Sequence, residues 1–312
     1  MKKLNIKWDG IHDSTGYLFS FAKSLSCAVK NSPWAEYAED IIATSGFAFR
    51  MWIAADLCPS STSIWSFDIQ KPCVENGGLT CDYVGRYWDQ DNIEEQKRLE
   101  AIANIKKSIN NGVPAISWDI GIPEWGLITG YDDETQTFTT LPAPVNHPAG
   151  TMPYDVLGKR ELPILSVLTV TGTNGKSQAD ILKDTIKLAV THLKGGEWCD
   201  NAKGLEAYPA LIKHFMPGVF TNENGFAWNR EYLLGTYGAL KYYAWKYFEK
   251  TEQNELAALY KEIYETWEKA FRWNATGESD EKGSVCGIDI AELLETAYKT
   301  ETAAVEIMSK MI

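Results

Sequence analysis

The hydrophobic period of this 312-residue chain changes near Val170 and does not change back. Between Pro114 and Val170, short apolar runs alternate with turn residues, a pattern typical of β-strands. Beyond Val170, apolar residues recur at helical spacing, as at positions 182, 186, 189, 190 and 193. The pattern predicts an α+β fold, with an antiparallel sheet in a domain of residues 1–172 and an all-helical domain of residues 173–312.

The composition excludes several classes of partner. An apolar content of 45% with twelve tryptophans favours a large buried core. A net charge of −12 without a Lys and Arg cluster argues against nucleic acid as a partner. The opening MKKLNIKWDG lacks the apolar run of a signal peptide, and no later segment is apolar over a membrane-spanning length. We therefore expect a cytoplasmic protein without a membrane partner.

The six cysteines follow no C-x-x-C spacing and have no histidines at zinc-finger spacing. We interpret them as reduced thiols of a cytoplasmic protein and expect no metal site. No dinucleotide fingerprint is present either, so no cofactor is expected.

Helices are predicted in the first third of the chain. Positions 15, 18, 22, 25 and 29 follow helical spacing, and Asp13 or Ser14 can cap the first free N–H groups. The first helix should therefore begin near Ser14. Two more helices are predicted at Pro33–Thr44 and Ile93–Asn110.

The stretch from Gly112 to Thr140 predicts a β-hairpin and a following strand. Its β-rich segments are Pro114–Asp119, Trp125–Tyr131 and Gln136–Leu141. Glycine, proline and the Asp132-Asp133 pair supply the turns between them.

This hairpin resembles that of a known enzyme family. The order GVP at Gly112–Pro114, a turn, and GLITGYD at Gly126–Asp132 is similar to bacteriocin-processing leader peptidases and to the N-terminal domain of the butirosin-biosynthesis acyltransferase. The runs Ser45–Arg50 and Gly204–Tyr208 also resemble the acyltransferase. The resemblance implies a papain-like fold, in which a helix start carries a nucleophilic cysteine and the hairpin carries a histidine base.

The chain departs from this family at both catalytic positions. The family's cysteine belongs where Asp13, Ser14 and Thr15 stand, and its histidine belongs where Glu124 and Trp125 stand. The resemblance therefore implies a protein without Cys-His catalysis that binds a small molecule or peptide in the cleft. The residues expected to line that cleft are Trp8, Asp13, Ser14, Arg50, Glu124 and Trp125.

Whether the chain is an enzyme stays open at the level of sequence. Ser14 is either a helix cap or a nucleophile, and Glu124 is either solvent-exposed or the acid or base of an acyl transfer or amide hydrolysis. Arg50 lies in an apolar run, so it either pairs with a carboxylate of the protein or clamps a carboxylate of a ligand.

The run from Gly172 to Ser177, GTNGKS, resembles the phosphate loop of Mur ligases and folylpolyglutamate synthetases. In that alternative, an ATP-binding ligase, Lys176 would hold phosphates and Ser177 would hold magnesium. Only helices are predicted after it, so no parallel strand is expected to support a nucleotide. A glycine turn with Ser177 as the cap of the next helix is the favoured interpretation.

Aromatic residues are dense between Trp228 and Phe248 and occupy several faces of a predicted helix. They are compatible with core packing, with a pocket between the domains, and with a homodimer contact.

Overall fold

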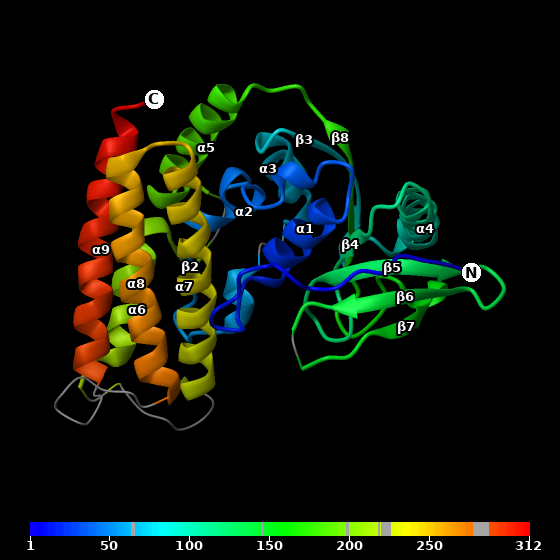
Figure 1. The fold of residues 1–312 in the computed structure, drawn as a ribbon. Helices are drawn as coiled ribbons and strands as arrows, with labels where there is room; N and C mark the ends of the chain where they lie inside the picture. The colour runs from blue at the N-terminus through cyan, green and yellow to red at the C-terminus, as the bar shows by residue number, and fades with distance from the viewer. Residues whose placement is uncertain (64–65, 145, 198–199, 218, 220–225, 277–286) are drawn as a thin grey trace. The chain divides into compact units, whose positions relative to one another are not determined.

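A computed structural model describes residues 1–63, 66–144, 146–197, 200–217, 219, 226–276 and 287–312 (Figure 1). The α+β prediction is confirmed, with an antiparallel sheet and a helical C-terminal region. The chain divides into two compact units. The sheet unit comprises Met1–Ile11, Ser20–Ser45 and Ser66–Ser177. The helical unit comprises His12–Phe19, Gly46–Trp65 and Gln178–Ile312.

The sheet unit is built on a seven-stranded sheet with the strand order β3-β8-β4-β5-β6-β7, and β1 pairs with β5. The strands are β1 (Lys2–Lys3), β3 (Leu79–Arg86), β4 (Ala115–Ser117), β5 (Gly126–Asp132), β6 (Thr137–Pro142), β7 (Gly150–Pro153) and β8 (Leu165–Thr173). Every pairing in this order is antiparallel. The predicted hairpin is confirmed, since Ala115 pairs with Ile128.

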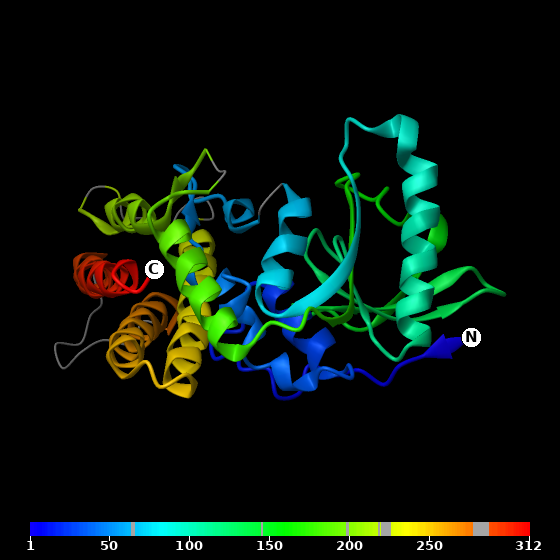
Figure 2. The ribbon, with the colours of Figure 1, turned by 90° about the horizontal axis from the view of Figure 1, so that it is seen from above.

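Helices cover both faces of this sheet (Figure 2). The helices of the sheet unit are α1 (Ser20–Lys30), α2 (Ile41–Thr44), α3 (Gln70–Asn76) and α4 (Glu94–Asn110). On one face, α4 buries Ile105 and Ile109 in a cluster with Ile128 and Phe138. On the other face lie α1 and α3. The helix predicted at Ile93–Asn110 is confirmed as α4.

The expected start of the first helix near Ser14 is wrong, because α1 begins at Ser20. Gly16 adopts a left-handed backbone conformation with φ +78°. The Asp13 carboxylate accepts the N–H of Leu18 at 3.0 Å, and the Thr15 hydroxyl donates to the carbonyl of Gly235 at 2.9 Å. These side chains hold the segment as a loop where the sequence pattern suggested a helical turn.

The helix predicted at Pro33–Thr44 also differs from the structure. The segment forms a 3-10 turn at Ala35–Tyr37, and an α-helix appears only as α2. Other 3-10 turns lie at Phe47–Phe49, Pro59–Thr62, Phe67–Ile69, Asp91–Ile93, Tyr154–Val156, Gly204–Glu206 and Lys213–Phe215.

The helical unit contains α5 (Gln178–Leu193), α6 (Ala207–Ile212), α7 (Phe226–Lys250), α8 (Asn254–Thr276) and α9 (Gly287–Ser309). A small antiparallel pair, β2 (Trp52–Ile53) with β9 (Ala202–Lys203), completes it. In Figure 1, α7, α8 and α9 lie side by side. None of the described helices combines the length and the apolar character needed to cross a membrane.

A buried polar network joins four helices of this unit. Lys241 of α7 donates to the Glu301 carboxylate of α9 at 2.6 Å. The Tyr208 hydroxyl of α6 donates to the other oxygen of Glu301 at 2.7 Å, and the indole N–H of Trp267 in α8 donates to Tyr208 at 3.0 Å. Burial lowers the pKa of Lys241, while its partner Glu301 opposes that shift.

Candidate functional site

Ser20 and Glu124 meet where the first turn of α1 faces the loop before β5. The Ser20 hydroxyl donates a hydrogen bond to the Glu124 carboxylate. The same hydroxyl oxygen accepts the backbone N–H of Trp125 at 3.2 Å. The carboxylate thus lies at the amino end of α1, where the helix dipole favours negative charge.

The loop that presents Glu124 is held in an uncommon backbone shape. Asp119 has φ +59° and Gly121 has φ +85°. The N–H of Ile120 donates to the carbonyl of Glu124 at 3.1 Å, which closes the loop. At Gly126, an added Cβ would lie 2.7 Å from the Cβ of Ile120, so the close approach requires glycine there.

Trp125 anchors this region from within the core. Its side chain is 0% exposed. The ring lies 4.9 Å from Phe21 of α1, 4.9 Å from Phe67 and 5.4 Å from Trp118, all in edge-on arrangements. Such aromatic contacts stabilise a core beyond their buried area. The indole is therefore a packing element, and Trp125 reaches the site through its backbone N–H.

Asp119 and Arg160 form an ion pair on the same loop. One Arg160 nitrogen lies 3.3 Å from the Asp119 carboxylate and donates to the Asp119 carbonyl at 2.7 Å. The second donates to the carbonyl of Gly121 at 3.1 Å. Burial raises the pKa of Asp119, and the attraction of Arg160 only partly offsets that rise. The sequence offered no signal for this pair, because 41 residues separate its members.

Trp8 is the third predicted site residue in the sheet unit. Its indole N–H donates to the carbonyl of Pro142 at 3.1 Å, and Pro142 pairs with Gly126 in the sheet. Trp8 therefore lies near the end of β5 that follows Glu124. The ammonium of Lys23 from α1 lies 5.7 Å from the centre of its ring.

Asp13, Ser14 and Arg50 belong to the helical unit, so the predicted cleft combines residues of both units and stays a prediction. Ser14 lies exposed in the loop before α1. His12, two residues before Ser14 in the sequence, stacks on Tyr242 with 3.6 Å between ring centres.

Arg50 is buried and paired inside its own unit. Its Nε lies 3.1 and 2.8 Å from the two carboxylate oxygens of Glu197. Its guanidinium carbon also lies 5.0 Å from the ring centre of Phe47 and 4.9 Å from that of Trp52. A carboxylate of the protein itself thus engages this arginine, as one of the two sequence interpretations expects.

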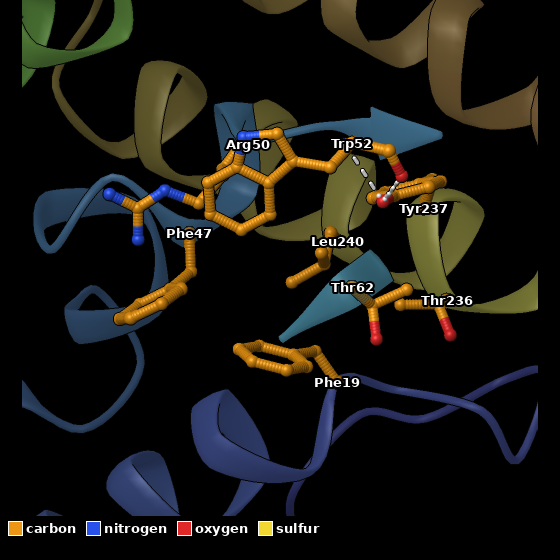
Figure 3. A pocket seen from close by; sticks show the side chains of 8 residues that line it. All are labelled: Phe19, Phe47, Arg50, Trp52, Thr62, Thr236, Tyr237 and Leu240. Atoms are coloured by element: carbon orange, nitrogen blue, oxygen red, sulfur yellow. Dashed lines mark hydrogen bonds between the residues drawn. The ribbon is translucent and has the colours of Figure 1, made fainter. Parts of the chain in front are cut away.

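A small hollow of about 210 Å³, counted with its solvent-open part, adjoins Arg50 (Figure 3). Its walls are mainly apolar, and the Tyr237 hydroxyl beside it bonds both backbone groups of Trp52. The lining residues are Phe19, Phe47, Arg50, Trp52, Thr62, Thr236, Tyr237 and Leu240.

The segment from Gly172 to Ser177 forms a side-chain-bonded turn. The Asn174 amide donates to the carbonyl of Glu75 at 2.8 Å, and Lys176 donates to the carbonyl of Asn76 at 3.4 Å. Both neighbours of β8 run antiparallel to it. Phosphate loops are supported by parallel strands, so this geometry favours the turn over a nucleotide site.

Chemically, the Ser20-Glu124 pair combines a hydroxyl, a carboxylate and a helix start. The sequence placed Glu124 at the hairpin but missed Ser20, because the helix was expected six residues earlier. The sequence signal for the later helix start was the glycine at position 16, since glycine commonly interrupts helices. Among the described residues, no group of three His, Cys, Asp or Glu side chains is arranged to hold a metal ion.

No protein-family model matches this chain, and a search of curated proteins finds no match either.

Proposed function

We propose that this chain is a papain-like protein in which the Ser20-Glu124 pair occupies the positions of the catalytic cysteine and histidine. It binds a small molecule or a peptide there and does not transfer acyl groups. One observation supports the proposal: Ser20, the first residue of α1, bonds Glu124. Glu124 stands six residues before Gly130 of the GLITGYD run, where the resemblance puts the histidine.

The chemistry of the pair favours binding over catalysis. A serine nucleophile needs a base that takes its proton, and a carboxylate is a much weaker base than an imidazole. The Ser20 oxygen also accepts the Trp125 N–H, which draws electron density away from the attacking atom. A carboxylate beside a hydroxyl instead suits recognition of an amide or ammonium group, which donates hydrogen bonds.

The same hydrogen bond supports one alternative, a divergent acyltransferase or amide hydrolase. In it, the Ser20 oxygen attacks a carbonyl carbon while its proton passes to Glu124. Backbone N–H groups at the start of α1 would stabilise the negative charge on the carbonyl oxygen. The nucleophile in this alternative is Ser20, in place of the Ser14 expected from sequence.

Labelling with a fluorophosphonate separates the two functions. The proposal predicts no adduct on Ser20, read by mass spectrometry of the intact protein and its peptides. A rapid adduct that is lost in Ser20→Ala and retained in Ser14→Ala would support the acyltransferase instead.

A thermal-shift screen with capped tripeptides and acylated amines tests binding directly. A ligand present at 100 times its Kd adds roughly 2.7 kcal/mol to the free energy of unfolding, which is a readily measured shift. Glu124→Gln should abolish the shift. Glu134→Gln, in the exposed turn between β5 and β6, should keep it. A library without any stabilising compound would count against the proposal.

A further inference from the structure

A second hollow lies within the sheet unit, between the C-terminal half of α4 and strands β3 and β8. It measures about 430 Å³, counted with its solvent-open mouth. Its lining residues are Trp34, Asp82, Asn104, Lys107, Ser108, Asn111, Val113, Thr169, Val170 and Thr171. None of them belongs to the Ser20-Glu124 pair, so the inference drawn from this hollow does not depend on the proposed function.

Two neutral amides at this hollow are available to a ligand. Asn104 lies in α4, and Asn111 directly follows its last residue, about two helical turns further along. Within the described part of the chain, their side chains make no hydrogen bond. Each amide offers two donors and one acceptor. A ligand with groups that both donate and accept would satisfy them.

One charged pair flanks these amides. The Lys107 ammonium lies 3.9 Å from the Asp82 carboxylate, and the two side chains are 68% and 47% exposed. An exposed pair at this distance is weak. Lys107 and Asp82 can therefore exchange this contact for hydrogen bonds to a ligand's hydroxyl groups at little cost. Because their charges are opposite, the hollow has no strong preference for a cation or an anion.

Apolar surface completes the hollow. Trp34 is partly exposed at its wall, and Val113 and Val170 are buried beside it. A tryptophan offers a large apolar body with a single N–H donor. Thr169 and Thr171 add hydroxyl groups from β8.

We propose that this hollow binds a neutral polyhydroxylated ligand of monosaccharide size. A sugar ring carries hydroxyl groups that donate and accept around its rim, which match the Asn104 and Asn111 amides. Its C–H groups are apolar and match Trp34. A phosphate ester fits less well, because Asp82 lies at the hollow and the chain carries a net charge of −12.

The test is saturation-transfer NMR on the intact protein with millimolar methyl α-D-glucopyranoside, methyl α-D-galactopyranoside and N-acetyl-D-glucosamine. Glycine and methyl phosphate serve as ionic comparisons, since each carries C–H protons that can report saturation. At least one sugar should receive saturation, and Trp34→Ala and Asn111→Ala should each weaken its binding about tenfold or more. Trp88→Ala removes a tryptophan of the same unit that is 53% exposed and outside the hollow, and it should bind as the unaltered protein does.

Two results would overturn the proposal. One is that no sugar receives saturation, or that only glycine or methyl phosphate does. The other is sugar binding that Trp34→Ala and Asn111→Ala leave unchanged. Asn111 lies exposed after the end of α4, so its substitution tests the site without disturbing the core, and circular dichroism checks that both variants remain folded.

Discussion

At the scale of single residues, the Ser20 hydroxyl is the point on which the candidate site depends. It donates to Glu124 and accepts from Trp125, so it links α1 to the strand β5 that carries the hairpin motif. A free serine nucleophile would keep its oxygen available for attack. The two hydrogen bonds of the Ser20 hydroxyl instead fix Glu124 at the start of α1. In the proposed function, a ligand with hydrogen-bond donors binds the carboxylate in this fixed position.

Sequence could place one member of this pair but not the other. Glu124 stands six residues before the Gly130-Tyr131 of the hairpin motif, so counting along the strand finds it. To identify Ser20 from the sequence, one must know where α1 begins. The loop before α1 is held by Thr15, which bonds Gly235, a residue 220 positions away. Local periodicity carries no information about such a distant partner.

Asp119 gives a prediction with a definite sign. Its pKa is raised above the ordinary 3.8, so the folded chain holds the proton to a higher pH than the unfolded chain. The contribution of Asp119 to the free energy of unfolding is therefore fully present below its unfolded pKa. This contribution is lost as the pH rises through the folded pKa. Asp119→Asn, which also tolerates a positive φ, removes this loss.

We therefore expect Asp119→Asn to gain stability relative to the unaltered protein as the pH rises from about 4 to about 7. Urea unfolding at both pH values measures the difference. The exposed Asp89→Asn is the matched control and should show a smaller pH-dependent change. An Asp119→Asn variant that loses stability toward neutral pH would show that the Arg160 pair outweighs burial.

At the scale of elements, α5 carries a histidine that makes stability depend on pH. His192 is buried against Glu197, whose carboxylate Arg50 already neutralises. Burial, followed by the charge of Arg50, lowers the pKa of His192 well below 6.5. The unfolded chain therefore binds this proton first, and stability falls as the pH drops below the unfolded value.

His192→Gln should accordingly reduce the stability lost between about pH 7 and about pH 5.5, as measured by urea unfolding. The loss should shrink but not vanish, because burial also lowers the pKa of His12 and His214. His147→Gln is the control, since this histidine lies in a loop outside the core. An unchanged pH dependence in His192→Gln would contradict the assignment.

The buried pair of α7 and α9 gives a prediction about helix packing. Lys241→Met leaves the Glu301 carboxylate buried without its ammonium partner and should cost about 3–5 kcal/mol in the free energy of unfolding. The double variant Lys241→Met with Glu301→Gln keeps an acceptor for Tyr208 and removes the charge, so it should recover at least half of that loss. Chemical denaturation measures both. A double variant that is no more stable than Lys241→Met would contradict this account.

Helices with a long and regular apolar pattern could be predicted from the sequence, and short helices could not. The pattern of α4 runs over 17 residues and sets the helix from sequence alone. The segment Pro33–Thr44 has apolar residues at suitable positions, yet only its last four residues form α-helix. Short segments gain little from helix propagation, so tertiary contacts decide their shape.

At the scale of the whole molecule, periodicity alone separates the sheet-rich part of the chain from the helical part. It does not reveal that residues 12–19 and 46–63 pack within the helical unit. The long-range bonds of those segments within the unit include the Trp52 N–H to the Tyr237 hydroxyl at 2.9 Å. Such bonds join residues 185 positions apart, which no local pattern encodes.

The central claim is that Ser20 and Glu124 stand where papain-like enzymes keep their cysteine and histidine. Its most direct test restores that pair by combining Ser20→Cys with Glu124→His, and measures alkylation of the introduced thiol by iodoacetamide across pH. Peptide mass spectrometry separates this thiol from the native ones, and burial raises the pKa of both Cys27 and Cys81 to about 12.

The account predicts that the double variant reacts at least about tenfold faster near pH 6 than Ser20→Cys alone, because the new imidazolium and the start of α1 together stabilise the thiolate. Equal rates for the two variants, with the ordinary pH dependence of a free thiol, would contradict it.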